Sequence, residues 1–203
     1  MSLGLRVSVI ASAYQESALP GHSARDLAIA HARGKAAGAA PASMLTVAAD
    51  TVVDIDGTAV GKPRDLAESR SMIEALSGRE HRVHTAFALR DEHTGRIVGD
   101  CVTTRVWFSA LTSATIDAYV ATGDGLDKAG AYGIQGFAAT LVERIDGDYF
   151  TVVGFPLAAF ARTLPQIGYA LCPAAAAERN GEARRTEVSA LFKRDPMNSR
   201  VLR

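Results

Sequence analysis

The chain has 203 residues and equal numbers of basic (Lys and Arg) and acidic (Asp and Glu) residues, 22 of each, so its formal net charge is zero. This balance argues against a protein that coats nucleic acid, because such proteins carry a basic excess. Apolar residues make up 48% of a chain long enough for one domain with a sizeable core, and no apolar run approaches the roughly 20 residues of a membrane span.

The first half of the chain alternates between strand and helix patterns. Alternating apolar residues predict a short strand over Leu5–Ile10, and alanines at helical spacing predict a helix over 24–38. The continuous apolar run Met44–Ala49 predicts a strand that is buried on both faces. Asp56-Gly57 is a hairpin turn signal, and a helix over 66–77 follows it.

The second half of the chain continues this alternation. Two long β-rich segments, His81–Leu89 and Ile97–Phe108, are joined by a loop typical of a hairpin. A helix over 113–122, a strand over Ala138–Ile145 and a helix over 157–167 complete the predicted elements. Strands that alternate with helices and include hairpins indicate an α/β domain with a mixed sheet.

The composition changes after residue 170. Residues 1–170 carry the predicted elements, whereas residues 171–203 are rich first in alanine and then in arginine and lysine. We expect a single domain followed by a basic, poorly ordered tail. An arm that binds nucleic acid or a partner is the alternative, and only the charge of the tail favours it.

Three charged side chains are notable for their positions. Asp50 follows the buried strand, where α/β sheets place ligand sites, so it is a candidate to hold a divalent cation or to activate water. Lys62 lies between Gly61 and Pro63 in a stiff loop, where it could contact phosphate. Lys35 lies on a face of the first predicted helix. Each also has an ordinary interpretation, namely a turn or cap, a solvated loop residue and a surface lysine, respectively.

A glycine-rich segment, residues 123–136, contains five of the chain's 18 glycines. Glycines let backbone N–H groups come close to a bound anion or base. Asp127, Lys128 and Gln135 are interspersed among them, and a glutamine amide has the paired donor and acceptor that read a base edge. A purely structural loop has no need of these side chains. The segment therefore indicates a ligand site, although it matches neither a P-loop nor a dinucleotide-binding motif.

The cysteines and the first residues bear on the cellular compartment. Cys101 and Cys172 lie far apart and outside any metal-binding pattern, so we expect two reduced thiols in a cytosolic protein, with a single disulfide as the alternative. The residues from Met1 onward show no basic region followed by a long apolar stretch, so we expect no secretory signal.

Seven blocks of sequence, in this order, resemble the Maf family of nucleoside triphosphate pyrophosphatases over about residues 4–168. The blocks are Ala49–Val53, Gly61–Pro63, Leu76–Arg79, His84-Thr85, Tyr119–Gly123, Leu126–Gly136 and Glu143–Phe150. The Tyr-Gly-Ile-Gln-Gly sequence at residues 132–136 resembles the subgroup that acts on dTTP and UTP.

This resemblance implies a fold and a reaction. The fold is an elongated α/β domain around a long, twisted mixed sheet, with a nucleotide cleft between two lobes. The reaction is hydrolysis of dTTP or UTP at the α-phosphorus to give the monophosphate and pyrophosphate, with Mg²⁺ or Mn²⁺ as cofactor. The family is also cytoplasmic and often dimeric, so the resemblance implies the nucleotide as partner and allows a homodimer. From the composition we expect neither a membrane nor nucleic acid as a partner.

The resemblance also implies roles for individual positions. Asp50 matches the catalytic carboxylate, and Glu16 matches an acidic residue that helps Asp50 to hold the metal. Lys35 and Lys62 match lysines that neutralise phosphate charge. The other substrate-binding candidates are Thr85, Asp127, Lys128 and Gln135. Of these, Gln135 is expected to recognise the pyrimidine. For Thr85, as for Thr51, the alternative is a hydroxyl that supports the residues in contact with phosphate.

The sequence departs from the family pattern at its start. Family members begin with a short strand and a Ser-x-Ser-Pro-Arg-Arg loop that leads into a helix, whereas Met1–Val7 matches the end of that helix and the strand after it. Without two arginines and a helix N-terminus at the phosphates, triphosphate binding and transition-state stabilisation would weaken by several kcal/mol. We therefore expect either an upstream start that restores the loop or a weakened homologue. A nucleotide-binding or regulatory protein without turnover is the alternative function.

Overall fold

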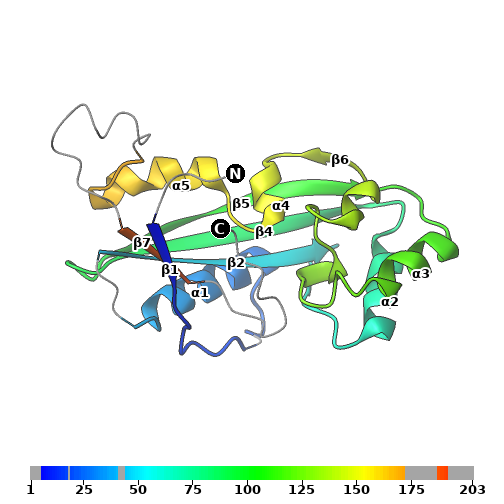
Figure 1. The fold of residues 1–203 in the computed structure, drawn as a ribbon, viewed down its shortest axis with the longest axis horizontal. Coiled ribbons are helices and arrows are strands. Elements are labelled where there is room, and N and C mark those ends of the chain that lie inside the picture. The colour runs from blue at the N-terminus through cyan, green and yellow to red at the C-terminus, as the bar shows by residue number, and fades with distance from the viewer. Residues whose placement is uncertain (1–5, 18, 41–43, 172–186, 192–203) are drawn as a thin grey trace.

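A mixed β-sheet runs along the length of the molecule (Figure 1). The computed structural model describes residues 6–17, 19–40, 44–171 and 187–191. Within these ranges the sheet has seven strands, which are β1 (Arg6–Val9), β2 (Leu45–Ile55), β3 (Thr58–Val60), β4 (Glu80–Asp91), β5 (Ile97–Phe108), β6 (Val142–Asp146) and β7 (Glu187–Leu191). The order across the sheet is β1-β7-β2-β4-β5-β6, with β3 paired to one end of β2.

Both strand directions occur in this sheet. Each neighbouring pair among the strands β2, β4, β5 and β6 is antiparallel. β4 and β5 are each 12 residues long. β7 is parallel to both β1 and β2. The prediction of a mixed sheet is therefore confirmed, and the long central strands account for the elongated shape of the molecule (Figure 1).

Helices lie on both faces and at one end of the sheet. In the described chain they are α1 (Ala24–Ala37), α2 (Leu66–Leu76), α3 (Ser113–Ala121), α4 (Tyr149–Val153) and α5 (Leu157–Thr163), with 3₁₀ turns η1 (Ala129–Ala131), η2 (Phe137–Thr140) and η3 (Leu164–Ile167). α1 covers one face, α4 and α5 lie over the other, and α2 and α3 pack together at the far end (Figure 1). None of the described helices is both long enough and apolar enough to cross a membrane.

The first three helices begin where the sequence provides a capping side chain. Ser23 Oγ accepts a hydrogen bond of 3.1 Å from the Asp26 N–H. Asp65 and Thr112 accept in the same way at the starts of α2 and α3. These three helices match the predicted ones to within one residue at either end.

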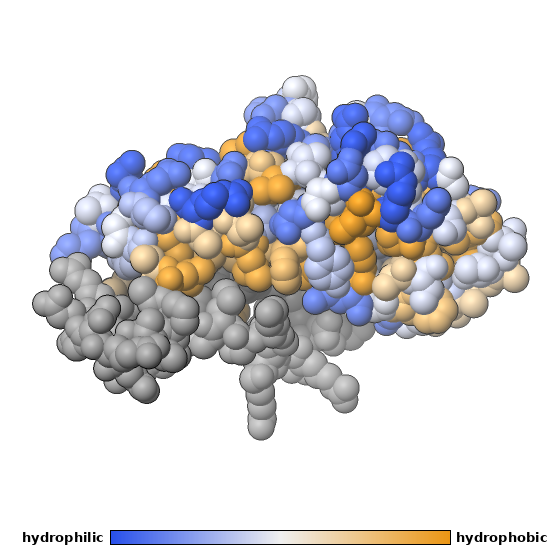
Figure 2. All heavy atoms as spheres, turned by 90° about the horizontal axis from the view of Figure 1, so that it is seen from above, coloured by the Kyte–Doolittle hydropathy of each residue, from blue (hydrophilic) through white to orange (hydrophobic). Residues whose placement is uncertain are grey.

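Small and branched apolar side chains form most of the core. Beneath α1, helix alanines pack on alanines of β2 and β4, and none of these buried alanines except Ala39 is more than 3% exposed. On the other face, Phe87, Phe155 and Phe160 form an aromatic group under α5. Figure 2, which shows the molecule from the α4 and α5 side, has apolar residues along its middle. Small side chains bring α1 close to β2, so polar groups on the two elements can meet.

Two segments differ from their predicted structure. The strand predicted over Ala138–Ile145 is instead the turn η2 followed by β6, which begins at Val142. Ala138 and Leu141 are both 1% exposed in the core, and this spacing of three suits a 3₁₀ turn and not a strand. α4 is absent from the prediction. Asp148 caps it by accepting from two backbone N–H groups of its first turn.

β7 comes from the segment predicted as a tail. Its residues form a strand between β1 and β2, in register with Arg6–Val9 on one side and Leu45–Ala48 on the other. The prediction has no strand here, because a short apolar patch in a basic segment carries little signal. Residues 172–186 and 192–203 lie outside the described residues, and the domain boundary at residue 170 stays a prediction.

Cys101 is a buried free thiol on β5. Burial raises its pKa to about 11. A thiol that ionises so reluctantly is a poor nucleophile and a poor metal ligand. Cys172 lies outside the described residues, so the choice between reduced thiols and a disulfide stays a prediction.

Candidate functional site

A cleft of about 880 Å³ opens at the edge of β2. β7 pairs with β2 over Leu45–Ala48 and β3 pairs with it over Val53–Ile55. The four residues between, Ala49–Val52, have no strand partner on that side within the described chain, and all four line the cleft. The cleft therefore opens where β2 lacks a strand partner, between α1 on one side and the glycine-rich segment on the other.

Lys35, Asp50 and Glu16 meet on the α1 side of the cleft. The Lys35 ammonium forms an ion pair with Asp50 and lies 3.1 Å from Glu16 Oε1. It also donates to the Ala49 carbonyl at 3.5 Å. The side chains of Lys35 and Asp50 are only 11% and 10% exposed, so the pair lies in the wall of the cleft. The structure therefore brings together three of the residues selected from the sequence.

Burial and charge act in opposite directions on this pair. Burial raises the pKa of the Asp50 carboxyl, because it disfavours the charged form, and this effect outweighs the nearby Lys35 ammonium. Burial alone would lower the pKa of Lys35, but Asp50 and Glu16 together raise it above its usual value. Asp50 is therefore a stronger base than an exposed aspartate, beside an ammonium that keeps its proton.

The glycine-rich segment forms the opposite wall of the cleft. Gly130 and Ala131 have positive φ angles of 69° and 61°. The Gly130 N–H donates to the Gly61 carbonyl at 3.0 Å, and a side chain at Gly130 would press on Val53 of β2. Glycine at this position thus ties the segment to the loop that carries Lys62.

Charged and amide side chains lie along this wall. The Lys128 ammonium pairs with Asp127 and donates to the Asp124 carbonyl at 2.7 Å. Lys62 and Gln135 are exposed and line the cleft with them. Four more residues selected from the sequence therefore lie in the same cleft, across from Asp50.

Thr85 does not line the cleft, so its position fits the predicted supporting hydroxyl and not the predicted contact with substrate. Its side chain is fully buried, and its hydroxyl donates to the Thr151 carbonyl of α4 at 2.7 Å. Thr51, which does line the cleft, shares a hydrogen bond of 2.9 Å with Thr85. The register of β2 with β4 sets these two threonines opposite each other. Thr85 therefore supports Thr51 from behind and does not reach the cleft itself.

Two buried aromatic side chains, Tyr132 and His81, support the glycine-rich wall. Tyr132 lines the cleft, and its hydroxyl lies 2.7 Å from His81 Nε2. His81 is 2% exposed, and its Nδ1 has no hydrogen-bond partner among the described residues. Burial lowers the pKa of His81 to about 4, so the ring is neutral near pH 7. Sequence reasoning did not select either residue, because nothing in the local pattern distinguishes a buried histidine from an exposed one.

The cleft offers two carboxylates that could share a divalent cation. Asp50 and Glu16 both lie against the same positive charge, the Lys35 ammonium. Mg²⁺ is commonly bound by one or two carboxylates together with substrate phosphates. The described residues contain no group of three or more His, Cys, Asp or Glu side chains that could hold a metal ion. The two carboxylates therefore fit a cation whose remaining ligands come from the phosphate groups of the substrate.

Comparison with known proteins gives relatives that cover most of the chain. A family model described as "Maf-like protein" matches residues 1–167. A protein of Thermus thermophilus named dTTP/UTP pyrophosphatase is 43% identical over 156 residues, which are 77% of this chain and 81% of that protein. A protein of Geobacter metallireducens with the same name is 43% identical over 169 residues, 82% of this chain and 88% of its own. A third, of Methanosarcina barkeri, is 37% identical over 171 residues, 83% and 87% of the two chains.

Proposed function

Because the chain belongs to the Maf family, we propose that it is a nucleoside triphosphate pyrophosphatase that hydrolyses dTTP and UTP. The products are the nucleoside monophosphate and pyrophosphate. The observation that carries the proposal is the cleft at the edge of β2, where a buried carboxylate lies beside one ammonium and faces further cations across the opening. The names of the relatives supply the two substrates.

In this proposal Asp50 acts as the general base. Its carboxylate lies in the wall of the cleft, where it would accept a proton from a water molecule that attacks the α-phosphorus. In-line attack places negative charge on the phosphate oxygens and on the departing pyrophosphate. Lys35 on one wall, with Lys62 and Lys128 on the other, would neutralise that charge.

Mg²⁺ or Mn²⁺ is the proposed cofactor. Asp50 and Glu16 would hold it together with phosphate oxygens of the substrate. When bound, such a cation polarises the phosphoryl group as a Lewis acid. Lys35, which bridges the two carboxylates, keeps a second positive charge at the same point.

Gln135 is the proposed reader of the base. The imide edge of uracil and thymine has an N–H donor between two carbonyl acceptors, and a carboxamide offers both an acceptor and a donor. Cytosine presents an amino donor and a ring-nitrogen acceptor at the corresponding edge, so it pairs only with the amide turned by 180°, and the proposed discrimination requires the site to hold the Gln135 amide in one orientation. A site built to hydrogen-bond one edge rejects a base that leaves its polar groups unpaired.

We further propose a cytoplasmic homodimer that takes the nucleotide as its partner and does not bind nucleic acid. The support is the family together with the zero formal net charge. Light scattering on the eluted protein measures the mass in solution, and a mass of one chain would rule out the dimer. A gel-shift series with single- and double-stranded DNA and RNA tests the absence of nucleic-acid binding.

The test of the proposed function is turnover of a nucleotide panel. The full chain is incubated with dTTP, UTP, CTP, GTP or ATP and with Mg²⁺ or Mn²⁺, and pyrophosphate and monophosphate are quantified. We expect both products from dTTP and UTP and far less from the other three. Calorimetry on the same nucleotides covers the alternative, because binding without turnover would identify a non-catalytic nucleotide-binding homologue. If the protein neither binds nor hydrolyses these nucleotides, the proposal is wrong.

A further inference from the structure

Tyr14 and His31 lie beside the proposed site but have no role in the function described above. The Tyr14 hydroxyl is 2.9 Å from His31 Nδ1, and the two rings meet edge-on with their centroids 5.7 Å apart. His31 is 6% exposed and lines the cleft. It precedes Lys35 by one turn of α1, so the two side chains lie on the same face of the helix.

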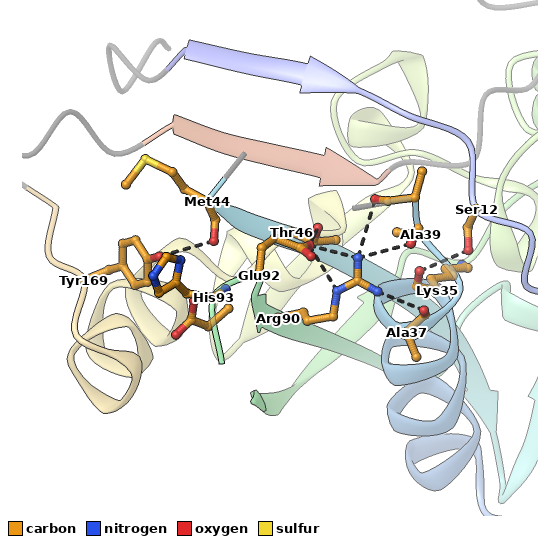
Figure 3. A network of polar contacts seen from close by, with 12 residues as sticks. Ser12, Lys35, Ala37, Ala39, Met44, Thr46, Arg90, Glu92, His93 and Tyr169 are labelled. Atoms are coloured by element: carbon orange, nitrogen blue, oxygen red, sulfur yellow. Dashed lines mark hydrogen bonds and ion pairs between the residues drawn. The ribbon is translucent and has the colours of Figure 1, made fainter. Parts of the chain in front are cut away.

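The segment that carries Tyr14 also carries Glu16, and it is fastened to the last turns of α1. Ser12 Oγ donates to the Lys35 carbonyl at 3.0 Å (Figure 3), and the Ala13 N–H donates to the Gly38 carbonyl at 3.1 Å. The next residue along the chain, Tyr14, is hydrogen-bonded to α1 through the His31 side chain. The chain from Ser12 to Glu16 thus follows α1 until Glu16 reaches Lys35.

The helix makes room for this contact at Gly34. A Cβ atom at Gly34 would overlap the ring of Tyr14, so the ring lies directly on the helix backbone. A glycine inside a helix is less favourable than alanine by about 0.5–1 kcal/mol. α1 therefore accepts a weaker helical residue at the turn where Tyr14 crosses it, one residue before Lys35.

We propose that Tyr14 and His31 form a clasp that holds Glu16 against Lys35, which makes both of them positioning residues for the carboxylate pair. The inference rests on the proposed function for its effect on turnover, but the clasp itself is a statement about residues 14–16. The hydroxyl–imidazole bond fixes Tyr14, and Glu16 is two residues further on. The hydrogen bonds of Ser12 and Ala13 to the end of α1 lie further from Glu16 along the chain than the Tyr14 hydroxyl bond does.

The first test measures the clasp without relying on activity. Tyr14→Phe removes the hydroxyl and leaves the ring on Gly34, and Tyr149→Phe is the matched control at an exposed tyrosine. Amide hydrogen exchange is followed for residues 12–17. We expect exchange over 14–17 to rise about 3- to 10-fold in Tyr14→Phe and to stay unchanged in the control. Unchanged exchange in Tyr14→Phe would overturn the proposal.

The second test asks whether the clasp acts through Glu16. The rate of dTTP hydrolysis is measured in a double-mutant cycle of Tyr14→Phe and Glu16→Gln. We expect Tyr14→Phe to lower the rate about 3- to 10-fold in the natural protein and less than about 2-fold in the Glu16→Gln background. Equal losses in both backgrounds would show that the pair does not act through Glu16 and would overturn the proposal.

A third variant separates the hydrogen bond from simple packing. His31→Gln keeps a side chain that can accept from the Tyr14 hydroxyl, whereas His31→Leu fills the space without an acceptor. We expect the glutamine variant to retain most of the exchange protection of 14–17 and the leucine variant to lose it. Equal protection in both would contradict the clasp. If the natural protein itself shows no turnover, the proposed function fails while the exchange measurements still decide the clasp.

Discussion

His81 makes the stability of this protein sensitive to acid in a way that can be measured. The ring is buried, bonded to Tyr132 through Nε2, and its pKa is lowered from 6.5 to about 4 by burial. In the unfolded chain the same ring takes up a proton near pH 6.5. Because the folded pKa lies below the unfolded one, the stabilising contribution is complete above about pH 6.5 and is lost as the pH falls toward 4.

The size of the effect follows from the two pKa values. Each pH unit between them changes the free energy of unfolding by about 1.4 kcal/mol, because the unfolded chain binds one more proton than the folded one. Across the interval from 6.5 to about 4 the loss is at most about 3 kcal/mol. Against a typical total stability of about 5–15 kcal/mol, this is a large share.

The assay is urea unfolding at several pH values from 7.5 down to 4, for the natural protein and for His81→Gln. His22→Gln at an exposed histidine is the matched control. We expect the free energy of unfolding to fall by about 3 kcal/mol more in the natural protein than in His81→Gln over this range, with the control following the natural protein. Parallel pH dependence in the natural protein and His81→Gln would refute the reasoning, whatever the stability of the variant at pH 7.

Three further predictions concern the fold and the base. Arg90 donates to carbonyls at the C-terminal end of α1 and pairs with Glu92 (Figure 3), so Arg90→Met should lower the free energy of unfolding in urea by about 2–4 kcal/mol. Deletion of residues 172–203 removes β7, so amide exchange in β1 should rise sharply while β4 and β5 stay protected. Gln135→Leu should lower kcat/KM for UTP about 10- to 100-fold. It should also lower the ratio of kcat/KM for UTP to kcat/KM for CTP, which an assay with both nucleotides in competition measures. Unchanged stability of Arg90→Met would contradict the first prediction, and unchanged amide exchange of β1 after the deletion would contradict the second. An unchanged preference for UTP over CTP in Gln135→Leu would contradict the third.

Much of the fold is predictable because local signals and tertiary structure agree. The first three helices have side-chain caps in the sequence, and Ile97–Phe108 is observed as β5 with its predicted bounds. α4 and η2 are different, because both are short and are defined by a cap or a core contact and not by periodicity. β7 is missed for a similar reason, since five residues in a basic segment become a strand only beside β1 and β2.

The site shows the same division. Position alone allows ordinary interpretations of Asp50 and Lys35, and the family resemblance selects both as site residues, which the structure brings together as an ion pair. The location of the cleft depends on which part of β2 lacks a neighbour, and register between distant strands has no local signal. A motif selects Thr85, but only the structure shows that its hydroxyl is bonded to Thr51 and to the Thr151 carbonyl and does not line the cleft. Tyr14 and His31 meet across 17 positions, which no local pattern could indicate.

Asp50 is proposed to activate water at the α-phosphorus of dTTP or UTP. The most direct measurement is the product of dTTP hydrolysis with Mg²⁺ for the natural protein and for Asp50→Asn, with Asp56→Asn in an exposed turn as control. We predict dTMP and pyrophosphate from the natural protein and the control, and a rate lower by about 10²- to 10⁴-fold in Asp50→Asn. Equal rates in Asp50→Asn and the natural protein, or dTDP and phosphate as products, would contradict the account.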